Sequence, residues 1–341
     1  MHLDLRGHPL HSRGLTVTLL ARLDGQLDAR AVLIDLRKRG LVPVGGDLGT
    51  PGIVHHMRLE AVIDPATRRL NAISAQQPNV AFEPGELTGG ESCRDPIAAI
   101  LGLEGATLDA GFARRLSAVF GGPRGCSHIL TLAQVLAAAT SWALDTAGEI
   151  VTATAWRPGE RVFRRDLLVD GSQRADGDLD LAAQLTDLVF APAPAVARPM
   201  DRFTTLHEVR VWAPVELATV SLGEVTAAER RRDKPALEAV DWADASPRLA
   251  GLAGLSLFRG ISAALMARLS APADRPLLDA MLMLAPTFIQ VCGAISEGWP
   301  ARAAAADSIL GMGGMPDSCF MWRKGGPLDR LRSPKDPIPT F

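Results

Sequence analysis

The stretch Val54-His55-His56-Met57-Arg58-Leu59 is followed, 152 positions later, by Leu206-His207-Glu208-Val209-Arg210-Val211. Both stretches share the order apolar, histidine, polar, apolar, arginine, apolar, and the mixture of the two residue kinds predicts half-buried β-strands. A pattern that returns at a fixed spacing is the mark of an internal repeat. The two stretches therefore suggest that the chain contains one unit twice.

Three further pairs of segments keep the order of this repeat, the first two at nearly the same spacing and the third at a spacing of 166, which implies about 13 extra residues in the second copy. They are Gly102-Leu103 with Gly254-Leu255, Arg115-Leu116-Ser117-Ala118 with Arg268-Leu269-Ser270-Ala271, and Trp156-Arg157 with Trp322-Arg323. A chain of this length has room for two domains. We therefore expect a tandem duplication, with a first copy at residues 1–160 and a second, diverged copy at 161–341. Pro158-Gly159 and the charged residues around it predict a linker near residues 157–165.

Within each predicted copy, strand patterns come first and helix patterns follow. Strands are expected at residues 16–23, 54–64, 68–75, 179–185 and 207–222, and helices at 109–120, 126–144, 257–270 and 277–295. This order favours an antiparallel sheet over alternating βαβ units. The expected fold is α+β, with two tandem copies of an antiparallel sheet packed with helices and related by a pseudo-twofold axis, so that one chain forms a pseudodimer.

The composition excludes several classes of protein. The 36 Lys+Arg and 38 Asp+Glu residues balance, so no nucleic-acid-binding surface is indicated, and the absence of tyrosine excludes phenolic acid-base chemistry. Charged, proline and glutamine residues break the apolar stretch 277–295, which predicts a buried helix and not a membrane span. The start resembles no signal peptide, and four cysteines are too few for a disulfide scaffold, so we expect a cytoplasmic protein.

The clearest chemical motif is the glycine-rich turn that begins at Gly121 and ends in Cys126-Ser127-His128, where a long helix is expected to begin. A thiol at a helix N-terminus with Arg124 nearby is expected to have a pKa below the free value of about 8.5. Cys126 and His128 can share a pocket only if Cys126 lies outside the helix, because residues two apart on a helix diverge. The alternative is a buried structural cysteine in a capping turn.

Two further residues are candidates for the same site. His55 is favoured over His56 because neighbouring strand residues face opposite sides of a sheet, and His55 alone recurs, as His207. Cys319 lies near the end of the second copy, whose counterparts of Cys126 and His128 are Asp279 and Met281.

Each copy thus lacks a part of the motif that the other copy retains. Such complementary loss is expected where a fused homodimer keeps one of its two composite sites. The hypothesis predicts that Cys126, His128 and Cys319 are neighbours in space. Independent divergence of structural positions is the alternative.

These motifs resemble the bacterial domain of unknown function 2889. Its members carry Ile-His-Asp-Met, which Val54-His55-His56-Met57 resembles, then Gly-Gly-x-x-Gly-Cys-Thr-His-Leu, which Gly121 to His128 matches closely, and a late Ser-Cys similar to Ser318-Cys319. The resemblance spans most of the first copy and, more faintly, the second. It implies no settled activity, only a context of aromatic-acid and acyl-thioester degradation. His56 stands where the family has Asp, which puts an orienting role for that residue in doubt.

The leading hypothesis is a thiol-dependent enzyme, an acyl transferase, lyase or hydrolase. Cys126 is the nucleophile, His55 or His128 is the general base, and Cys319 completes the catalytic site. The expected substrate is a small acid, aromatic in the family's context, or its acyl thioester. Arg124 and Arg323 are the residues expected to bind a cofactor such as a coenzyme A thioester.

Two alternatives stay open. In the first, Cys126, His128, Cys319 and His55 bind zinc or iron and support hydrolytic or lyase chemistry. In the second, the duplication forms a non-catalytic, pseudo-symmetric binding protein with unreactive thiols. Elemental composition separates the first alternative from the leading hypothesis.

Overall fold

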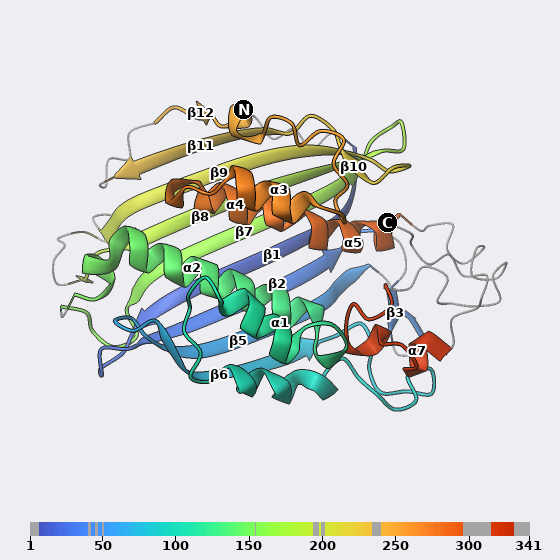
Figure 1. Cartoon of the computed structure of the whole chain (residues 1–341), viewed down its shortest axis with the longest axis horizontal. Helices are drawn as coiled ribbons and strands as arrows, with labels where there is room; N and C mark the ends of the chain where they lie inside the picture. Colours follow the sequence, from blue (N-terminus) through green and yellow to red (C-terminus); the bar gives the residue numbers. More distant parts are fainter. Residues whose placement is uncertain are drawn as a thin grey trace.

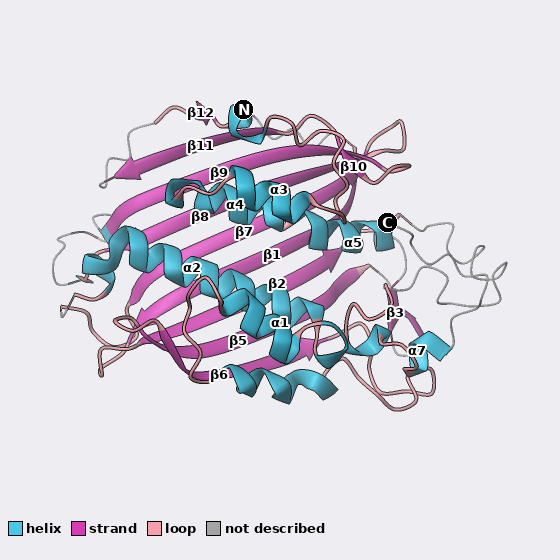
Figure 2. Cartoon of the chain, viewed as in Figure 1, coloured by secondary structure: helices cyan, strands magenta, loops and turns pink. Residues whose placement is uncertain are grey.

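The structure is a computed structural model that describes residues 7–39, 42–44, 47–49, 51–153, 155–193, 198, 202–233, 240–295 and 315–330. One ten-stranded antiparallel sheet forms the first layer, and the helices gather on one of its faces (Figures 1 and 2). The strands follow the order β12-β11-β9-β8-β7-β1-β2-β5-β6, and β10 pairs with β9. The expected α+β fold with an antiparallel sheet packed with helices is confirmed.

The strands of the large sheet are β1 (His8–Ala21), β2 (Leu27–Arg37), β5 (Gly52–Asp64), β6 (Arg69–Asn79), β7 (Arg161–Gln173), β8 (Leu179–Phe190), β9 (Phe203–Glu216), β10 (Ser221–Leu222), β11 (Thr226–Asp233) and β12 (Ala243–Asp244). Two short strands, β3 (Val42–Val44) and β4 (Asp47–Gly49), pair separately. The α-helices are α1 (Phe112–Phe120), α2 (Ser127–Val151), α3 (Ile261–Arg268), α4 (Arg275–Leu282), α5 (Leu284–Ala294) and α7 (Pro327–Arg330). Short 3₁₀ helices include η2 (Gly122–Arg124) and η7 (Phe320–Trp322).

The strand order is the same on both sides of the sheet centre. From the central pair outward, β1, β2, β5 and β6 follow one another on one side and β7, β8, β9 and β11 on the other. The helices of each half follow its strands in the chain; α4 packs on β8 and β9, whereas α2 and α5 each contact both central strands, β1 and β7 (Figure 1). The tandem duplication, its boundaries at 160 and 161 and its pseudo-twofold axis stay predictions.

The alternation of residues along each strand explains why helices cover one face. Leu15, Val17 and Leu19 of β1 are buried, whereas Thr16 and Thr18 between them are only partly buried. Successive strand residues point to opposite faces, so the apolar set lies under the helices. The polar set faces the other side of the sheet.

Six strands of the described residues were not predicted from the sequence, the short β3, β4 and β12 and the longer β2, β7 and β11. Strands β2, β7 and β11 are rich in charged residues, and the region around residues 157–165, expected to be a linker, contains the start of β7 at Arg161. This expectation was wrong because Arg165 is buried in an ion pair with Asp187 of β8 and does not face solvent. The helix expected at 277–295 is divided into α4 and α5 near Met283.

Two helical segments within the described ranges are long and apolar enough to span a membrane, Ser127–Val151 and Pro272–Ala294. In the most apolar window of each, 67% and 61% of the residues are buried inside the protein. Helix α2 contacts β1, β2, β5 and β7, and α5 contacts β1 and β7. Such burial is typical of the core helices of a folded domain, and length and composition alone do not assign either segment to a membrane.

Candidate functional site

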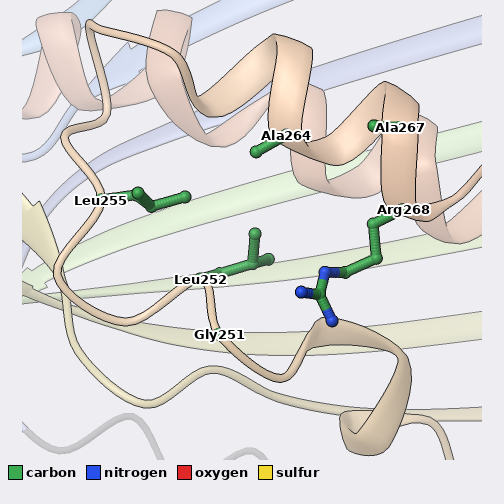
Figure 3. A pocket seen from close by; sticks show the side chains of 6 residues that line it. All are labelled: Gly251, Leu252, Leu255, Ala264, Ala267 and Arg268. Atoms are coloured by element: carbon green, nitrogen blue, oxygen red, sulfur yellow. The ribbon is translucent and has the colours of Figure 1, made fainter.

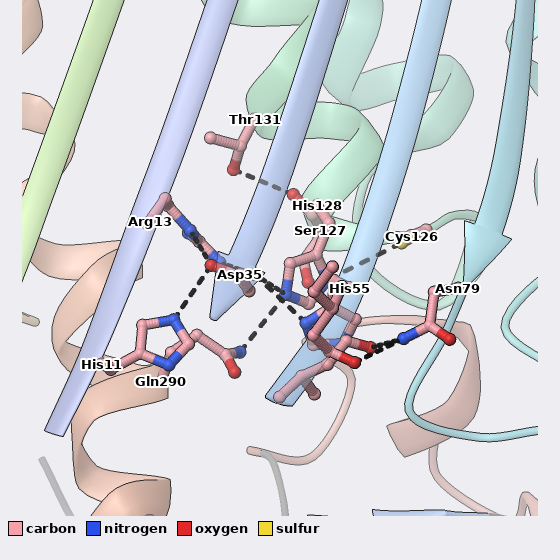
Figure 4. Close-up of polar contacts among 12 residues, drawn as sticks. His11, Arg13, Asp35, His55, Asn79, Cys126, Ser127, His128, Thr131 and Gln290 are labelled. Atoms are coloured by element: carbon pink, nitrogen blue, oxygen red, sulfur yellow. Dashed lines mark hydrogen bonds and ion pairs between the residues drawn. The ribbon is translucent and has the colours of Figure 1, made fainter. Parts of the chain in front are cut away.

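Three charged or polar residues lie side by side across neighbouring strands. Arg13 of β1 pairs in register with Asp35 of β2, and Asp35 pairs with His55 of β5. All three point to the face covered by helices, where the beginning of α2 brings Cys126 and His128 above them (Figure 4). The sheet thus forms the floor of a polar site, and the helix forms its wall.

Asp35 is the centre of this site and is fully buried. Its Oδ1 accepts hydrogen bonds from Arg13 Nε (2.8 Å) and His11 Nε2 (3.1 Å), and its Oδ2 from Arg13 Nη2 (2.8 Å) and His55 Nδ1 (3.1 Å). Burial by itself would raise the pKa of Asp35, but the charge and hydrogen bonds of Arg13, with those of the two histidines, hold the pKa well below its ordinary value of 3.8. Asp35 is therefore an ionised hydrogen-bond acceptor.

His128 connects Asp35 to the thiol. Its Nε2 lies 3.5 Å from Asp35 Oδ2, and its ring stacks on that of His55 with centroids 3.7 Å apart. Burial, together with the nearby His55 and Arg13, lowers the pKa of His128 well below 6.5. The imidazole is therefore neutral at pH 7. Nε2 carries the ring proton when it donates to Asp35, whereas it must be unprotonated to accept from the amide nitrogen of Gln290, 3.2 Å away. Only the first tautomer leaves Nδ1 free to accept a proton from Cys126.

Cys126 is the N-cap residue of α2, with extended backbone angles of −100° and 124°. Because it lies outside the helix, it can share a pocket with His128, as the sequence analysis required. Its Sγ lies 3.9 Å from Nδ1 of His128 and accepts a hydrogen bond from Nε2 of Gln77 on β6 (3.3 Å). The thiol, the imidazole and the carboxylate of Asp35 thus form a continuous chain.

The expected low pKa of Cys126 is wrong. Burial raises the pKa of its thiol to about 11, although the backbone N–H groups of Ile129 and His128 at the helix N-terminus act in the opposite direction. The exposed guanidinium of Arg124 donates to the carbonyl of Ser117. Loss of water around the sulfur therefore outweighs the helix N-terminus, and the resting group is a neutral thiol.

Cys319 comes from the far end of the described chain and lies against the turn that precedes Cys126. The backbone N–H of Phe320 donates to the carbonyl of Gly125 at 2.9 Å. The thiols of Cys93, Cys126 and Cys319 are close enough to influence one another, and burial raises the pKa of Cys93 and of Cys319. The segment that carries Cys319 and the turn that carries Cys126 are thus neighbours. Cys93 is an additional thiol here that the sequence analysis did not single out.

The two arginines expected to bind a cofactor already have protein partners. Arg124 bonds to Ser117, and Arg323 forms an ion pair with Glu91 at 2.5 Å while its guanidinium lies 4.0 Å from the ring centroid of Phe320. Among the described residues, neither arginine side chain forms a hydrogen bond or an ion pair with Cys126, His128 or Asp35. Their role in binding a cofactor stays a prediction.

A second polar cluster lies in the other half of the sheet. Arg165 donates from Nε and Nη2 to the carboxylate of Asp187 at 2.7 and 2.6 Å, and from Nη1 to Asp279 of α4. Arg165 and Asp187 stand 152 positions after Arg13 and Asp35. Asp279 contacts this pair as His128 contacts the first, so in space it corresponds to His128 and not, as the sequence spacing suggests, to Cys126. The second cluster consists of ion pairs and offers no thiol.

The donor atoms of the first cluster also meet the geometric needs of a metal ion. One ligand atom each from Asp35, His55 and His128 lie within 4.8 Å of one another. Two histidines and one carboxylate are a known ligand set for zinc or non-haem iron. Arg13 opposes a cation here because it already donates to both oxygens of Asp35.

A pocket elsewhere in the second half offers no comparable chemistry. Its lining residues are Gly251, Leu252, Leu255, Ala264, Ala267 and Arg268 (Figure 3). A single arginine among glycine, alanine and leucine supplies neither nucleophile nor base. The Cys126 site is therefore the stronger candidate.

Four residues of the site were not predicted from the sequence, namely Arg13, Asp35, Gln77 and Gln290. The side-chain amide nitrogen of Gln290 lies 3.2 Å from Nε2 of His128. The spacing of 152 carries a signal for two of them, because Arg13 and Asp35 recur as Arg165 and Asp187. No signal of that kind marks Gln290, which reaches the site from α5 of the second half. The site as built therefore combines residues from both halves of the chain.

Comparison with known proteins supports the sequence resemblance in the first half. A family described as "Protein of unknown function (DUF2889)" matches residues 11–141. No curated protein and no solved structure matches the chain. The matched range contains Arg13, Asp35, His55, Cys126 and His128, but it leaves the second half and the duplication untested. Residues 11–141 of this chain are therefore similar to the DUF2889 family.

Proposed function

We propose that this protein is an enzyme that uses Cys126 as a nucleophile on the carbonyl of a small acid or its acyl thioester. One observation carries the proposal: Cys126 Sγ lies 3.9 Å from His128 Nδ1, and His128 Nε2 lies 3.5 Å from the buried carboxylate of Asp35. A nucleophile, a base and a group that orients the base are the arrangement of many acyl-transfer enzymes. His128 is the general base in this arrangement, and His55 stacks on it.

The proton movements follow from the pKa directions. The thiol is neutral because burial raises its pKa to about 11, so it becomes nucleophilic only as it loses its proton to His128. Sulfur bonds to the carbonyl carbon while its proton moves to Nδ1, and Asp35 stabilises the imidazolium that forms. The proton then passes to the leaving thiolate of the substrate, which leaves an acyl group on Cys126. Water or a second substrate removes this acyl group. In carbon-carbon cleavage the sulfur adds to the carbonyl carbon, the bond from that carbon to its neighbour breaks, and the released carbanion takes the proton from His128.

The composite nature of the site favours one active site for the whole chain. Gln290 of the second half contacts His128, and the segment that carries Cys319 packs on the turn before Cys126. The second cluster holds Asp187 and Asp279 around Arg165 and contains no thiol. We therefore propose that the second half completes the site of the first and catalyses no reaction at its own cluster.

The direct test is acylation of the protein by a panel of acyl thioesters, with benzoyl-coenzyme A and acetyl-coenzyme A as the first members. Intact-mass and peptide mass spectrometry would locate the acyl group. We expect it on Cys126, absent from Cys126→Ser and formed about 10² to 10⁴ times more slowly in His128→Asn. The matched control is His207→Asn, which alters the counterpart of His55 in the other half. Full turnover of any thioester by Cys126→Ser would refute the proposal.

A second candidate is a metal site, because Asp35, His55 and His128 place three ligand atoms within 4.8 Å. In this arrangement Asp35 takes the place that the sequence analysis gave to the cysteines. Bound zinc or iron would act as a Lewis acid toward a carbonyl oxygen. These residues would hold the ion and position it, and Arg13 would have to yield one of its hydrogen bonds to Asp35.

Elemental analysis of protein purified without chelators separates the two candidates. The thiol proposal expects acylation that a chelator does not change. About one equivalent of zinc or iron per chain, retained in Cys126→Ser but lost in His55→Asn, would favour the metal site.

A further inference from the structure

We propose that Arg37 binds an oxyanion beside the Cys126 site, and that this oxyanion is the carboxylate of an organic acid. The anion site stands on its own geometry. Its description as part of a substrate site rests on the function proposed above.

Arg37 is a buried cation without a carboxylate partner. Its side chain is 6% exposed, its Nη1 donates to the carbonyl of Gly293 at 2.7 Å, and its buried Nε has no hydrogen-bond partner. Among the described residues no carboxylate forms an ion pair with it, since the nearby Asp35 is occupied by Arg13. A buried guanidinium is costly unless it is paired and hydrogen-bonded, and the planar fork of arginine matches a carboxylate. Within the described part of the chain, Arg37 thus lacks the anion that a buried arginine normally has.

Arg37 also lies next to the catalytic chain. It follows Asp35 by two positions on β2, so both side chains face the helices, and it pairs in register with His11 of β1. His11 in turn bonds to Asp35 through Nε2. On the helix side, Gly293 is three positions after Gln290, which contacts His128. A ligand held by Arg37 would therefore approach the site from the side of α5.

Gly293 packs closely on the guanidinium of Arg37, and His11 pairs in register with Arg37. A Cβ placed on Gly293 would lie 2.8 Å from Nη2 and 3.4 Å from Cζ of Arg37, so a side chain at this position would force the guanidinium to shift. Nδ1 of His11 is buried and has no hydrogen-bond partner either. Two unsatisfied polar atoms on paired positions of β1 and β2 leave hydrogen-bonding capacity that a polar ligand would fill.

The other half of the sheet shows that the fold does not need this polar pair. The positions 152 residues after His11 and Arg37 are Phe163 and Val189, which pair in register on β7 and β8. Both are buried, with exposures of 0% and 2%. An apolar pair thus fills the corresponding place, so a purely structural role does not require His11 and Arg37.

The test is binding of sodium benzoate, measured by isothermal titration calorimetry, with inorganic phosphate as the second probe. We expect saturable benzoate binding that Arg37→Met weakens by about tenfold or more, the effect of losing a hydrogen bond to a charged group. Gly293→Ala should weaken benzoate binding as well, because the new methyl group displaces the guanidinium. Arg157→Met is the matched control, because the side chain of Arg157 is 67% exposed and has no part in the site, and it should bind benzoate as the wild type does.

A double variant that introduces the residue pair of the other half of the sheet controls for loss of binding through misfolding. The double variant His11→Phe with Arg37→Val repeats the pair Phe163 and Val189, and circular dichroism would confirm that it is folded. We expect it to bind no benzoate. Unchanged benzoate affinity in Arg37→Met, or no saturable binding to the wild type, would overturn the proposal. Tighter binding of phosphate than of benzoate, abolished by Arg37→Met, would overturn the choice of a carboxylate.

The two proposals fail separately. Cys126→Ser removes the nucleophile and should bind benzoate as the wild type does. If Cys126→Ser retains turnover while Arg37→Met loses benzoate binding, the thiol mechanism is wrong and the anion site stands. If Cys126 proves essential for turnover and Arg37→Met binds benzoate normally, the anion site is wrong and the thiol mechanism stands.

Discussion

Arg13 donates two hydrogen bonds of 2.8 Å to the two carboxylate oxygens of Asp35, and neither side chain is more than 2% exposed. No other carboxylate forms an ion pair with Arg13 in the described part of the chain. The same bidentate pair recurs between Arg165 and Asp187, but there Asp279 provides a second carboxylate. The charge of Arg13 is balanced by Asp35 alone among the described residues, whereas that of Arg165 is balanced by Asp187 and Asp279.

This difference predicts unequal costs for removing the two carboxylates. Asp35→Asn leaves the charge of Arg13 buried and unpaired, so we expect it to lower the free energy of unfolding by about 3 to 5 kcal/mol. Asp187→Asn is the matched variant and should cost less, because Arg165 keeps Asp279. Urea unfolding followed by circular dichroism would measure both. Equal losses would show that the second carboxylate does not compensate.

The pKa directions predict how stability varies with pH. The pKa of His128 is lowered by burial, so the unfolded chain binds this proton more tightly and stability should fall as the pH drops below 6.5. The pKa of Asp35 is also lowered, so its contribution is present above 3.8 and is lost as the pH falls through its folded-state pKa. Urea midpoints measured from pH 8 to pH 4 test the first effect. In His128→Asn the decline near pH 6 should become shallower, and an unchanged slope would contradict the buried neutral imidazole.

Burial of Cys126 predicts slow reaction with neutral alkylating agents. With the pKa of its thiol at about 11, only a small fraction is thiolate at pH 8, and the rate of iodoacetamide labelling should rise up to about pH 11. Peptide mass spectrometry after timed labelling gives the rate at each cysteine. A labelling midpoint below pH 8.5 would instead support the low pKa that the sequence motif suggests.

The turn before Cys126 tolerates no side chain at Gly125. A Cβ there would lie 2.1 Å from the backbone oxygen of Phe120, so Gly125→Ala must displace the turn, at a cost of about 1 to 3 kcal/mol, and with it the thiol. Gly148 of α2 has open space around its Cβ, and Gly148→Ala should stabilise the protein by about 0.5 to 1 kcal/mol. Thermal unfolding and acylation of Cys126 would be measured for both variants. A Gly125→Ala protein with normal stability and acylation would show that this turn does not position the thiol.

Part of the fold could be predicted from local sequence. The strand around His55, the strand around His207 and the helix that begins beside Cys126 have clear patterns, and each is present in the structure. Strand β7 was missed because its arginines and aspartates are typical of exposed segments. Only their pairing across the sheet, as between Arg165 and Asp187, makes burial of these charges possible.

The sequence by itself determined the α+β class and the pairing of Cys126 with His128 at the start of a helix, because both depend on residues close together in the chain. Tertiary structure alone decided that Asp35 lies at the centre of the site and that Arg37 lies beside it. It also reversed the expected pKa of Cys126, since a pKa depends on how much water the fold removes. Burial and contacts between distant strands and helices are properties of the packed chain, and no local pattern encodes them.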